Sequence, residues 1–226
     1  MECTLIDLGL TRYDQAYTFQ KSCLEEVKFG SVDGVLILTE HKPVFTFGRF
    51  AKPENLLVSE DFLKEEGVDL ANVERGGDIT FHGPGQLVVY PIINLAKHKK
   101  DIHKFMRDLE EVVMRTLQDF SIKSFRIKGR TGVWTKKGKI ASLGIAASRW
   151  ITYHGLALNV STDLKYFGMI NPCGFKDINV TSVKDILGSI EDADSLKEKF
   201  MSHFCDIFNI NIAQLQNRPS FKIPCW

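Results

Sequence analysis

Residues 132–148, GVWTKKGKIASLGIAAS, and residues 150–160, WITYHGLALNV, form the most strand-like part of the sequence and decide the fold class. Within the first segment, TKKGK around Gly138 is typical of a hairpin turn. Two long strands so close together in the sequence should pair with each other in antiparallel fashion. The middle of the chain therefore predicts an antiparallel sheet.

Strands and helices follow each other irregularly on both sides of this region. Further strands are expected at residues 3–10, 35–40, 44–49, 87–95 and 124–128, with a tight HKP turn between the second and the third. Helices are expected from a cap at Thr11 to Gly30, from Ser59 to Glu66, and over residues 101–120 and 192–209. This order predicts an α+β or mixed α/β fold, without regular βαβ alternation. One domain over residues 1–226 is expected, and whether residues 175–226 form a small helical appendage stays open.

Composition and charge narrow the class of protein. With 44% hydrophobic and 25% charged residues, the 226-residue chain is typical of a soluble globular protein. Its 29 basic residues nearly balance its 28 acidic ones, so nothing in the charge points to nucleic acid. The N-terminus lacks a signal-peptide pattern, and no apolar stretch is long enough to span a membrane. The five cysteines form no CxxC pair, which disfavours a disulfide scaffold or a zinc site and favours a cytoplasmic location.

The segment RGGDITFHGPGQ, residues 75–86, is rich in glycine and leads directly into an apolar strand. It matches neither a Walker A loop nor a dinucleotide fingerprint, and no helix follows whose N-terminus could bind an anion. Glycine lacks a Cβ atom, so the segment is either a pair of tight turns or a backbone that a ligand approaches closely. Arg75 and His82 favour the second interpretation.

A second set of candidate residues lies downstream. Cys173, in MINPCGF, has proline and glycine beside it and is expected on a turn, whereas the other cysteines lie in or beside apolar segments and are expected to be inert. A nucleophilic thiol needs a cationic or basic neighbour to ionise near neutral pH. Lys139 and His154 both stand on apolar strand faces. A solvated lysine and a core histidine are the alternatives, and spacing alone does not join these residues into one site.

Four motifs in this order resemble those of the lipoyl(octanoyl) transferase family. They are RGGDITFHGPGQLVVYP, KIASLG, YHGLALNV and INPCG, and the segments EHKPVFTFGR, ENLL and GRTGVW are also similar to that family. The resemblance covers about residues 10–175 and is specific through the combination of motifs. Ala141 stands where some members carry cysteine, a difference expected to be neutral.

The resemblance implies a fold, an activity and a set of site residues. The fold is that of the biotin and lipoate protein ligases, a mixed, largely antiparallel sheet flanked by helices. The activity is transfer of an octanoyl group from octanoyl-acyl carrier protein to the lysine amine of lipoyl domains of 2-oxoacid dehydrogenase complexes or the glycine cleavage H protein. No cofactor and no metal are implied. Cys173 is implied as the nucleophile that carries the acyl group as a thioester, and Lys139 as its partner. The residues implied for the acyl site are Arg75, Gly76, Gly77, Asp78, Ile79, Thr80, Phe81, His82, Ser142, Leu143, Gly144, His154, Gly155, Leu156 and Ala157.

The chemistry also predicts how these residues act. Lys139 protonates the departing thiolate and then, once neutral, removes a proton from the incoming amine. Backbone amides of Gly76, Gly77 or Gly144 are expected to stabilise the thioester oxyanion. One alternative is a ligase that activates free lipoate or biotin with ATP, but it needs no cysteine nucleophile and a GRGR-type loop is absent. The other alternative is a protein that binds acyl chains without turnover, which needs neither Lys139 nor Cys173.

Overall fold

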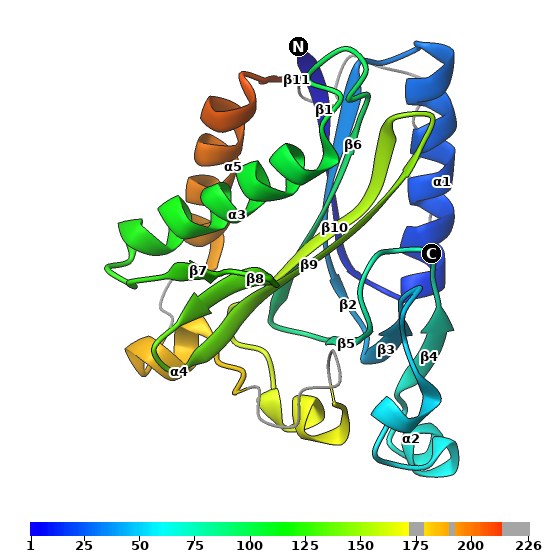
Figure 1. The fold of residues 1–226 in the computed structure, drawn as a ribbon, viewed down its shortest axis with the longest axis vertical. Coiled ribbons are helices and arrows are strands. Elements are labelled where there is room, and N and C mark those ends of the chain that lie inside the picture. The colour runs from blue at the N-terminus through cyan, green and yellow to red at the C-terminus, as the bar shows by residue number, and fades with distance from the viewer. Residues whose placement is uncertain (172–178, 190–192, 214–226) are drawn as a thin grey trace.

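The structure is a computed structural model and describes residues 1–171, 179–189 and 193–213. Within these residues eight strands form one sheet and three strands form a smaller one (Figure 1). In spatial order the main sheet consists of β11 (Asn211–Ala213), β1 (Glu2–Thr11), β2 (Gly34–His41), β6 (Gln86–Ile93), β10 (Ile151–Asn159), β9 (Gly138–Ser148), β8 (Arg130–Thr135) and β7 (Phe125–Ile127). The smaller sheet consists of β4 (Asp69–Asn72), β3 (Val44–Phe47) and β5 (Ile79–His82).

The β9–β10 hairpin stands at the centre of the architecture, as the sequence predicts. Its two strands pair antiparallel from Ile151 opposite Ser148 to Leu158 opposite Ala141. β6 pairs antiparallel with both β10 and β2, whereas β1 lies parallel to β2 and to β11. The main sheet is therefore mixed and largely antiparallel, which confirms the predicted fold class.

Helices cover both faces of the main sheet. On one face lies α1 (Tyr13–Phe29), whose buried Phe19, Cys23 and Val27 pack into one hydrophobic cluster with strand residues. On the other face lie α3 (Ile102–Asp119) and α5 (Ala193–Phe208), which share a second and larger cluster (Figure 1). Two short helices, α2 (Glu60–Glu65) and α4 (Val183–Leu187), and the 3₁₀ turns Pro53–Asn55 and Leu164–Met169 complete the described elements.

The helix ends follow local sequence signals. Gly30 ends α1 in a left-handed conformation with φ of 80°, which glycine adopts without steric cost. The side chain of Asp101 accepts the backbone N–H of Lys104 at the start of α3, and Ser59 accepts that of Phe62 at the start of α2. These caps satisfy amides that have no partner inside the helix.

One local prediction is wrong. Thr11 does not cap α1; it ends β1, and its hydroxyl lies 3.0 Å from the Thr39 hydroxyl. The residue at the cap position is Arg12. The tight HKP turn between β2 and β3 is present as predicted, but its two strands do not pair with each other, because β2 pairs in the main sheet while β3 pairs in the smaller one. The turn instead carries the chain from one sheet to the other, and so places the glycine-rich segment beside the main sheet.

The described residues after position 180 pack against the rest of the chain. Phe200 and Phe204 of α5 are fully buried in the cluster that α3 shares. β11 extends the main sheet next to β1. This stretch therefore contributes to the principal core.

Candidate active site

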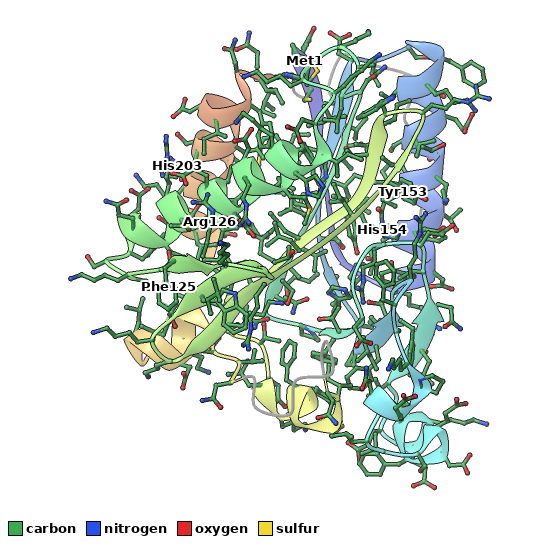
Figure 2. The ribbon with its side chains drawn as sticks, viewed as in Figure 1. Met1, Phe125, Arg126, Tyr153, His154 and His203 are labelled. Carbon is green, nitrogen blue, oxygen red and sulfur yellow. The ribbon has the colours of Figure 1, made fainter. Side chains whose placement is uncertain are left out.

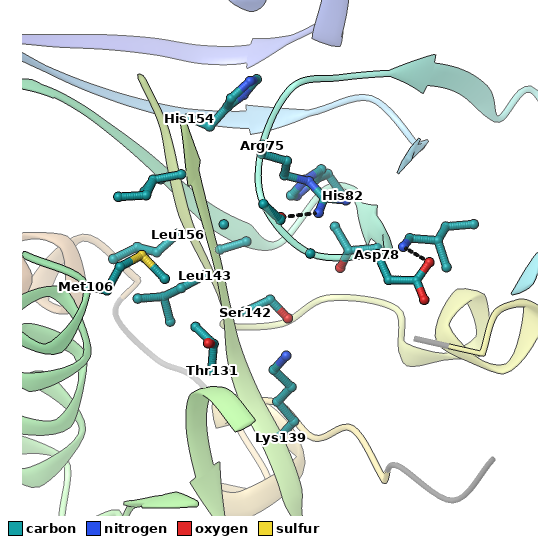
Figure 3. A pocket seen from close by; sticks show the side chains of 18 of the residues that line it. Arg75, Asp78, His82, Met106, Thr131, Lys139, Ser142, Leu143, His154 and Leu156 are labelled. Atoms are coloured by element: carbon teal, nitrogen blue, oxygen red, sulfur yellow. Dashed lines mark hydrogen bonds between the residues drawn. The ribbon is translucent and has the colours of Figure 1, made fainter. Parts of the chain in front are cut away.

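A cavity of about 510 Å³ is lined by β9, β10, the loop at residues 75–78 and the first turns of α3 (Figure 3). Small-molecule pockets typically measure roughly 300–1,000 Å³, so this one can hold a ligand of modest size. Of the residues predicted for the acyl site, those that line it are Arg75, Gly76, Gly77, Asp78, Ile79, Thr80, His82, Ser142, Leu143, Gly144, His154, Gly155, Leu156 and Ala157. Lys139 lines the cavity as well. The fold thus brings three of the four motifs together.

One wall of the cavity consists of small residues from the hairpin. Gly155 stands opposite Gly144, and Ala157 stands opposite Ser142. Because side chains alternate between the two faces of a sheet, these four residues share a face, while Leu156 belongs to the core cluster beneath α3. The missing side chains at Gly144 and Gly155 let neighbouring backbone come close, from the loop at Gly76 and from Val89 of β6.

The glycine-rich loop lies along the part of β9 that continues beyond its pairing with β8. The Gly76 amide donates to the carbonyl of Ile145 at 3.0 Å, and a Cβ added at Gly144 would lie 2.7 Å from the Gly76 carbonyl oxygen. Only glycine at position 144 lets the loop come so close. The Gly76 amide is therefore engaged within the protein, which removes it from the three amides predicted for an oxyanion site.

Two charged side chains of this loop are buried and hydrogen-bonded. Arg75 donates from Nε and Nη2 to the Thr46 hydroxyl, at 3.2 and 2.8 Å, and from Nη2 to the Thr46 carbonyl at 2.6 Å. The Asp78 carboxylate accepts from the Asn55 side chain at 2.6 Å and from the Ile79 amide at 2.7 Å. Since buried charges are stable only with such partners, these contacts set the shape of the loop.

Three histidines and two tyrosines surround the inner end of the cavity. Tyr13 stacks on His82 with ring centroids 6.2 Å apart, and its hydroxyl lies 3.4 Å from His154 Nδ1. His41 Nε2 lies 2.6 Å from the Tyr90 hydroxyl. Burial lowers the pKa of His41 to about 4, and burial together with the nearby charge of Arg75 lowers the pKa of His154 to about 3. These groups are therefore neutral near pH 7.

The tautomer of His82 follows from its partners. Gln86 Nε2 donates to the Phe81 carbonyl at 3.2 Å and to Asn159 Oδ1 at 2.8 Å, which leaves Gln86 Oε1 as an acceptor. His82 Nδ1 lies 2.7 Å from that oxygen and donates to it. Burial, followed by repulsion from His41, holds the pKa of His82 well below its ordinary value. The ring is neutral, with the lone pair on Nε2.

His154 does not follow the alternation that the sequence predicts. Its backbone has a φ of 56°, a left-handed conformation that is uncommon for a residue other than glycine. Its amide donates to Gln20 Oε1 on α1 at 2.9 Å, and its ring stacks on Tyr17. Figure 2 shows Tyr153 and His154 together on the side of α1. His154 therefore joins α1 to the inner end of the cavity instead of facing the core with Leu156.

The loop is also tied to α1 through Glu74, the residue before Arg75. Tyr17 donates its hydroxyl to Glu74 Oε2, and Lys21 Nζ donates to Oε1 at 3.3 Å. These hydrogen bonds lower the pKa of Glu74, against the opposing effect of burial. An anchored carboxylate at this position holds the entry to the loop against the helix.

Lys139 stands at the other end of the cavity, and Figure 3 shows its side chain pointing into it. Its backbone N–H donates to the Asn179 carbonyl at 2.8 Å, and its carbonyl accepts from the Thr181 amide at 3.0 Å. Its Nζ lies 5.7 Å from the centre of the Trp134 ring. Lys139 is thus a half-buried lysine of the site, in contrast to the solvent-exposed Lys136 and Lys137 of the turn.

Two predicted residues need separate mention. Cys173 lies outside the described residues; the nearest described residues on either side, Asn171 and Asn179, bond to the Asn55 carbonyl and the Lys139 amide. Phe81 does not line the cavity, because its side chain points to the other face of β5 and stacks on Tyr166 at 4.4 Å. At 1% exposure Phe81 is a core residue beneath the loop.

Sequence reasoning missed several residues that line the cavity. They include Tyr13, Val88, Tyr90, Met106, Thr131, Trp134 and Ile145. In the sequence most of these occupy apolar positions of helices or strands, and nothing there separates a cavity wall from an ordinary core. Thr131 and Trp134 lie in GRTGVW, a segment noted only for its family likeness, which was the one available signal.

The described cysteines are poor nucleophiles. Burial raises the pKa of Cys3 and of Cys23 to about 12, and it also raises the pKa of Cys205. Among the described residues no group of three His, Cys, Asp or Glu side chains is arranged to hold a metal ion. Over the same residues, no helix is long and apolar enough to cross a membrane.

Known proteins resemble this chain over nearly all of its length. Residues 12–205 match the family described as the lipoyl protein ligase A/B catalytic domain. An octanoyltransferase of Thermoanaerobacter sp. (strain X514) is 46% identical over 212 residues, which are 93% of this chain and 92% of the relative. A bipartite lipoate protein ligase of Thermoplasma acidophilum superposes with a TM-score of 0.73 at 20% identity, over 96% of this chain and 88% of the other. Biotin protein ligase from Aquifex aeolicus gives a TM-score of 0.53 at 14% identity, over 92% and 70%.

Proposed function

The chain belongs to the lipoyl protein ligase A/B catalytic domain family, and we propose that within it the protein is an octanoyltransferase that acts through Cys173 and Lys139. The donor is octanoyl-acyl carrier protein. The acceptor is the lysine amine of a lipoyl domain, in a 2-oxoacid dehydrogenase complex or the glycine cleavage H protein. The observation that carries the proposal is the cavity itself, because it joins a wall of small residues to a half-buried lysine.

The cavity fits an acyl chain better than a charged ligand. The histidines that line its inner end, His82 and His154, are neutral, and the Arg75 guanidinium there is hydrogen-bonded to Thr46. The wall formed by Gly144, Gly155 and Ala157 carries no charge. Each buried methylene contributes about 0.8 kcal/mol, so an eight-carbon chain gains on the order of 5 kcal/mol. That gain differs little from one carbon to the next, so rejection of longer chains requires a blind end to the cavity.

The first half of the reaction is a thioester exchange. The Cys173 thiolate attacks the octanoyl carbonyl, a new S–C bond forms, and the bond to the donor sulfur breaks. The Lys139 ammonium protonates the departing thiolate. An adjacent ammonium also favours the thiolate of Cys173, and a decrease of about two pKa units corresponds to roughly 2.7 kcal/mol.

The second half transfers the acyl group to the acceptor. The neutral lysine amine of the lipoyl domain attacks the Cys173 thioester, an amide bond forms, and the cysteine sulfur leaves as a thiolate. Lys139, now neutral, takes the proton that the amine loses, which restores the starting ion pair. Because a thioester is already activated, the cycle needs neither ATP nor a cofactor. The cytoplasm, with reduced thiols, is the compartment that suits it.

Intact-protein mass spectrometry tests this function. The protein is mixed with octanoyl-acyl carrier protein without ATP, as wild type and as Cys173→Ala. We expect one octanoyl mass on the wild type alone, which disappears when an apo lipoyl domain is added. No adduct, together with transfer only from free octanoate and ATP, would show an ATP-dependent ligase. Binding without any transfer would show a protein that holds acyl chains.

A further inference from the structure

Glu110 is a buried carboxylate on the face of α3 that packs against the main sheet. Its side chain is 1% exposed, and its helical neighbours Leu109 and Val113 belong to the apolar core. Arg107 and Arg126 both contact Oε2, at 2.7 and 3.0 Å. A buried charge is costly unless it is paired, and these two arginines supply the pairing.

The other oxygen of Glu110 reaches across to β8. Oε1 accepts the backbone N–H of Gly132 at 3.0 Å, within the buried interior. This bond fixes the position of β8 relative to α3 at Gly132. Gly132 is also where β8 passes Lys139, and it has a φ of 131°, in a region that favours glycine.

Gly132 leaves the space that the Lys139 side chain occupies. A Cβ added at position 132 would lie 2.5 Å from Lys139 Cε and 2.7 Å from the Ala141 carbonyl oxygen. Both distances are too short for real atoms, so any side chain there would displace the lysine, the strand or both. Trp134, two residues further along β8, contributes the ring near Lys139 Nζ.

We infer that Glu110 is a positioning residue for the reaction, acting through Gly132 to set the place of the Lys139 ammonium. The inference rests on the proposed function, in which Lys139 serves Cys173. Glu110 itself does not line the cavity. Glu110 accepts the Gly132 N–H and so fixes this part of β8. Gly132 packs on the methylenes of Lys139, and this contact directs the lysine side chain into the cavity. A bond to the backbone of a residue that packs on Lys139 distinguishes Glu110 from an ordinary buried ion pair.

The test measures alkylation of Cys173 by iodoacetamide against pH, followed on the cysteine-bearing peptide by mass spectrometry. The full chain is used as wild type, Gly132→Ala, Glu110→Gln, Lys139→Met and the double variant Gly132→Ala/Lys139→Met. Arg107→Ala is the matched control, because it removes a half-exposed partner of Glu110 Oε2 and leaves the Gly132 bond in place. Gly67→Ala controls for strain alone, since Gly67 has a φ of 67° and its added Cβ would meet nothing within 4 Å. Thermal melting of every variant reports folding.

We expect Gly132→Ala to raise the apparent pKa of Cys173 alkylation by about one unit, toward the ordinary thiol value. Its alkylation rate at pH 7 should fall about tenfold, and that of Glu110→Gln by a smaller factor. In the Lys139→Met background Gly132→Ala should change the rate less than twofold, because coupled residues are not additive. Arg107→Ala and Gly67→Ala should keep the wild-type profile, whatever their melting temperatures.

Two different results overturn the inference. If Lys139→Met leaves the Cys173 profile unchanged, the cysteine and lysine do not interact, and the proposed mechanism fails together with the inference. If Lys139→Met raises the pKa but Gly132→Ala does not, or if Gly132→Ala acts equally in both backgrounds, the mechanism stands and the positioning role is wrong. If Glu110→Gln lowers the melting temperature but leaves the Cys173 alkylation profile unchanged, Glu110 contributes to stability only and the inference is wrong.

Discussion

The inner end of the cavity and its Lys139 end differ in the ionisable groups that they contain and in how deeply these groups are buried. At the inner end His41, His82 and His154 are buried, and burial pushes their pKa values below the physiological range. At the other end the half-buried Lys139 stands beside β8, and its backbone is hydrogen-bonded to Asn179 and Thr181, which follow Cys173 in the sequence. The histidines of the inner end therefore add no charge at neutral pH, and the Arg75 guanidinium there is hydrogen-bonded to Thr46, whereas under the proposed function the Lys139 ammonium lies where bonds are exchanged.

The same contrast holds for the supports behind each end. The inner end is fixed by α1, through Gln20, Tyr17 and Tyr13. The Lys139 end is fixed by α3 on the opposite face of the sheet, through Glu110. Under the proposed function, the two helices on the two faces support binding and chemistry separately, which predicts that substitutions at the two ends separate KM from kcat.

The largest effect is expected from the charged end. Lys139→Met should lower kcat for octanoyl transfer by about a thousandfold, because general acid and base catalysis typically contributes roughly 10²–10⁴-fold. The melting temperature should change little, since the lysine is only half-buried. Steady-state transfer to an apo lipoyl domain and a thermal melt measure both quantities. Lys136→Met, at an exposed lysine of the same turn, is the control; equal losses in the two variants would contradict the assignment.

The neutral end predicts a loss of stability in acid. The folded pKa values of His41 and His154, about 4 and about 3, lie below the unfolded value of about 6.5, so the unfolded chain binds more protons between these limits. The stabilisation is complete above pH 6.5 and is lost as the pH falls, by about 1.4 kcal/mol per pH unit for each histidine. Denaturant unfolding between pH 7 and pH 5 measures the slope.

His41→Gln should reduce that slope by the contribution of one proton. His103→Gln, at an exposed histidine of α3, provides the comparison and should leave the slope near that of the wild type. An unfolding free energy that does not change between pH 7 and pH 5 would show that the buried histidines do not control acid stability.

A smaller effect is expected where the loop meets β9. Gly144→Ala should reduce kcat/KM about tenfold, because its Cβ would lie 2.7 Å from the Gly76 carbonyl and would push the loop away from the wall. Gly76→Ala should cost less, since its Cβ would meet only the Ile145 carbonyl, at 3.6 Å. Transfer kinetics with melting curves compare the pair. A larger loss for Gly76→Ala would reverse the assignment of the contact.

The smallest effect is expected from the tie between α1 and the loop. Tyr17→Phe removes the hydrogen bond to Glu74, which is worth about 1 kcal/mol, and should raise the KM for the donor a few-fold with kcat nearly unchanged. Thr18→Ala, at the next and exposed position of α1, is the control. If kcat falls instead of KM rising, the inner end takes part in the chemical step and the separation of the two ends is wrong.

Several elements could be predicted because their signals are local. The β9–β10 hairpin follows from two adjoining strand-like segments, and α3 and α5 follow from apolar residues at helical spacing. Part of the site could be predicted because its glycines and its lysine lie in short motifs that resemble those of the family. Thr11 was misjudged because its hydroxyl bonds to the neighbouring β2 strand, a partner that no local pattern reveals.

The sequence by itself determined the mixed α+β fold, the glycine-rich loop and the family in which Lys139 and Cys173 are proposed to act together, since each depends on residue types at short spacings. Only the tertiary structure decided that Phe81 faces the core, that His154 turns toward α1, and that Glu110 reaches Gly132 beside Lys139. The physical reason is that these features arise between segments far apart in the chain. Close approach, burial and hydrogen bonding there depend on how the sheet and its two helical layers come together.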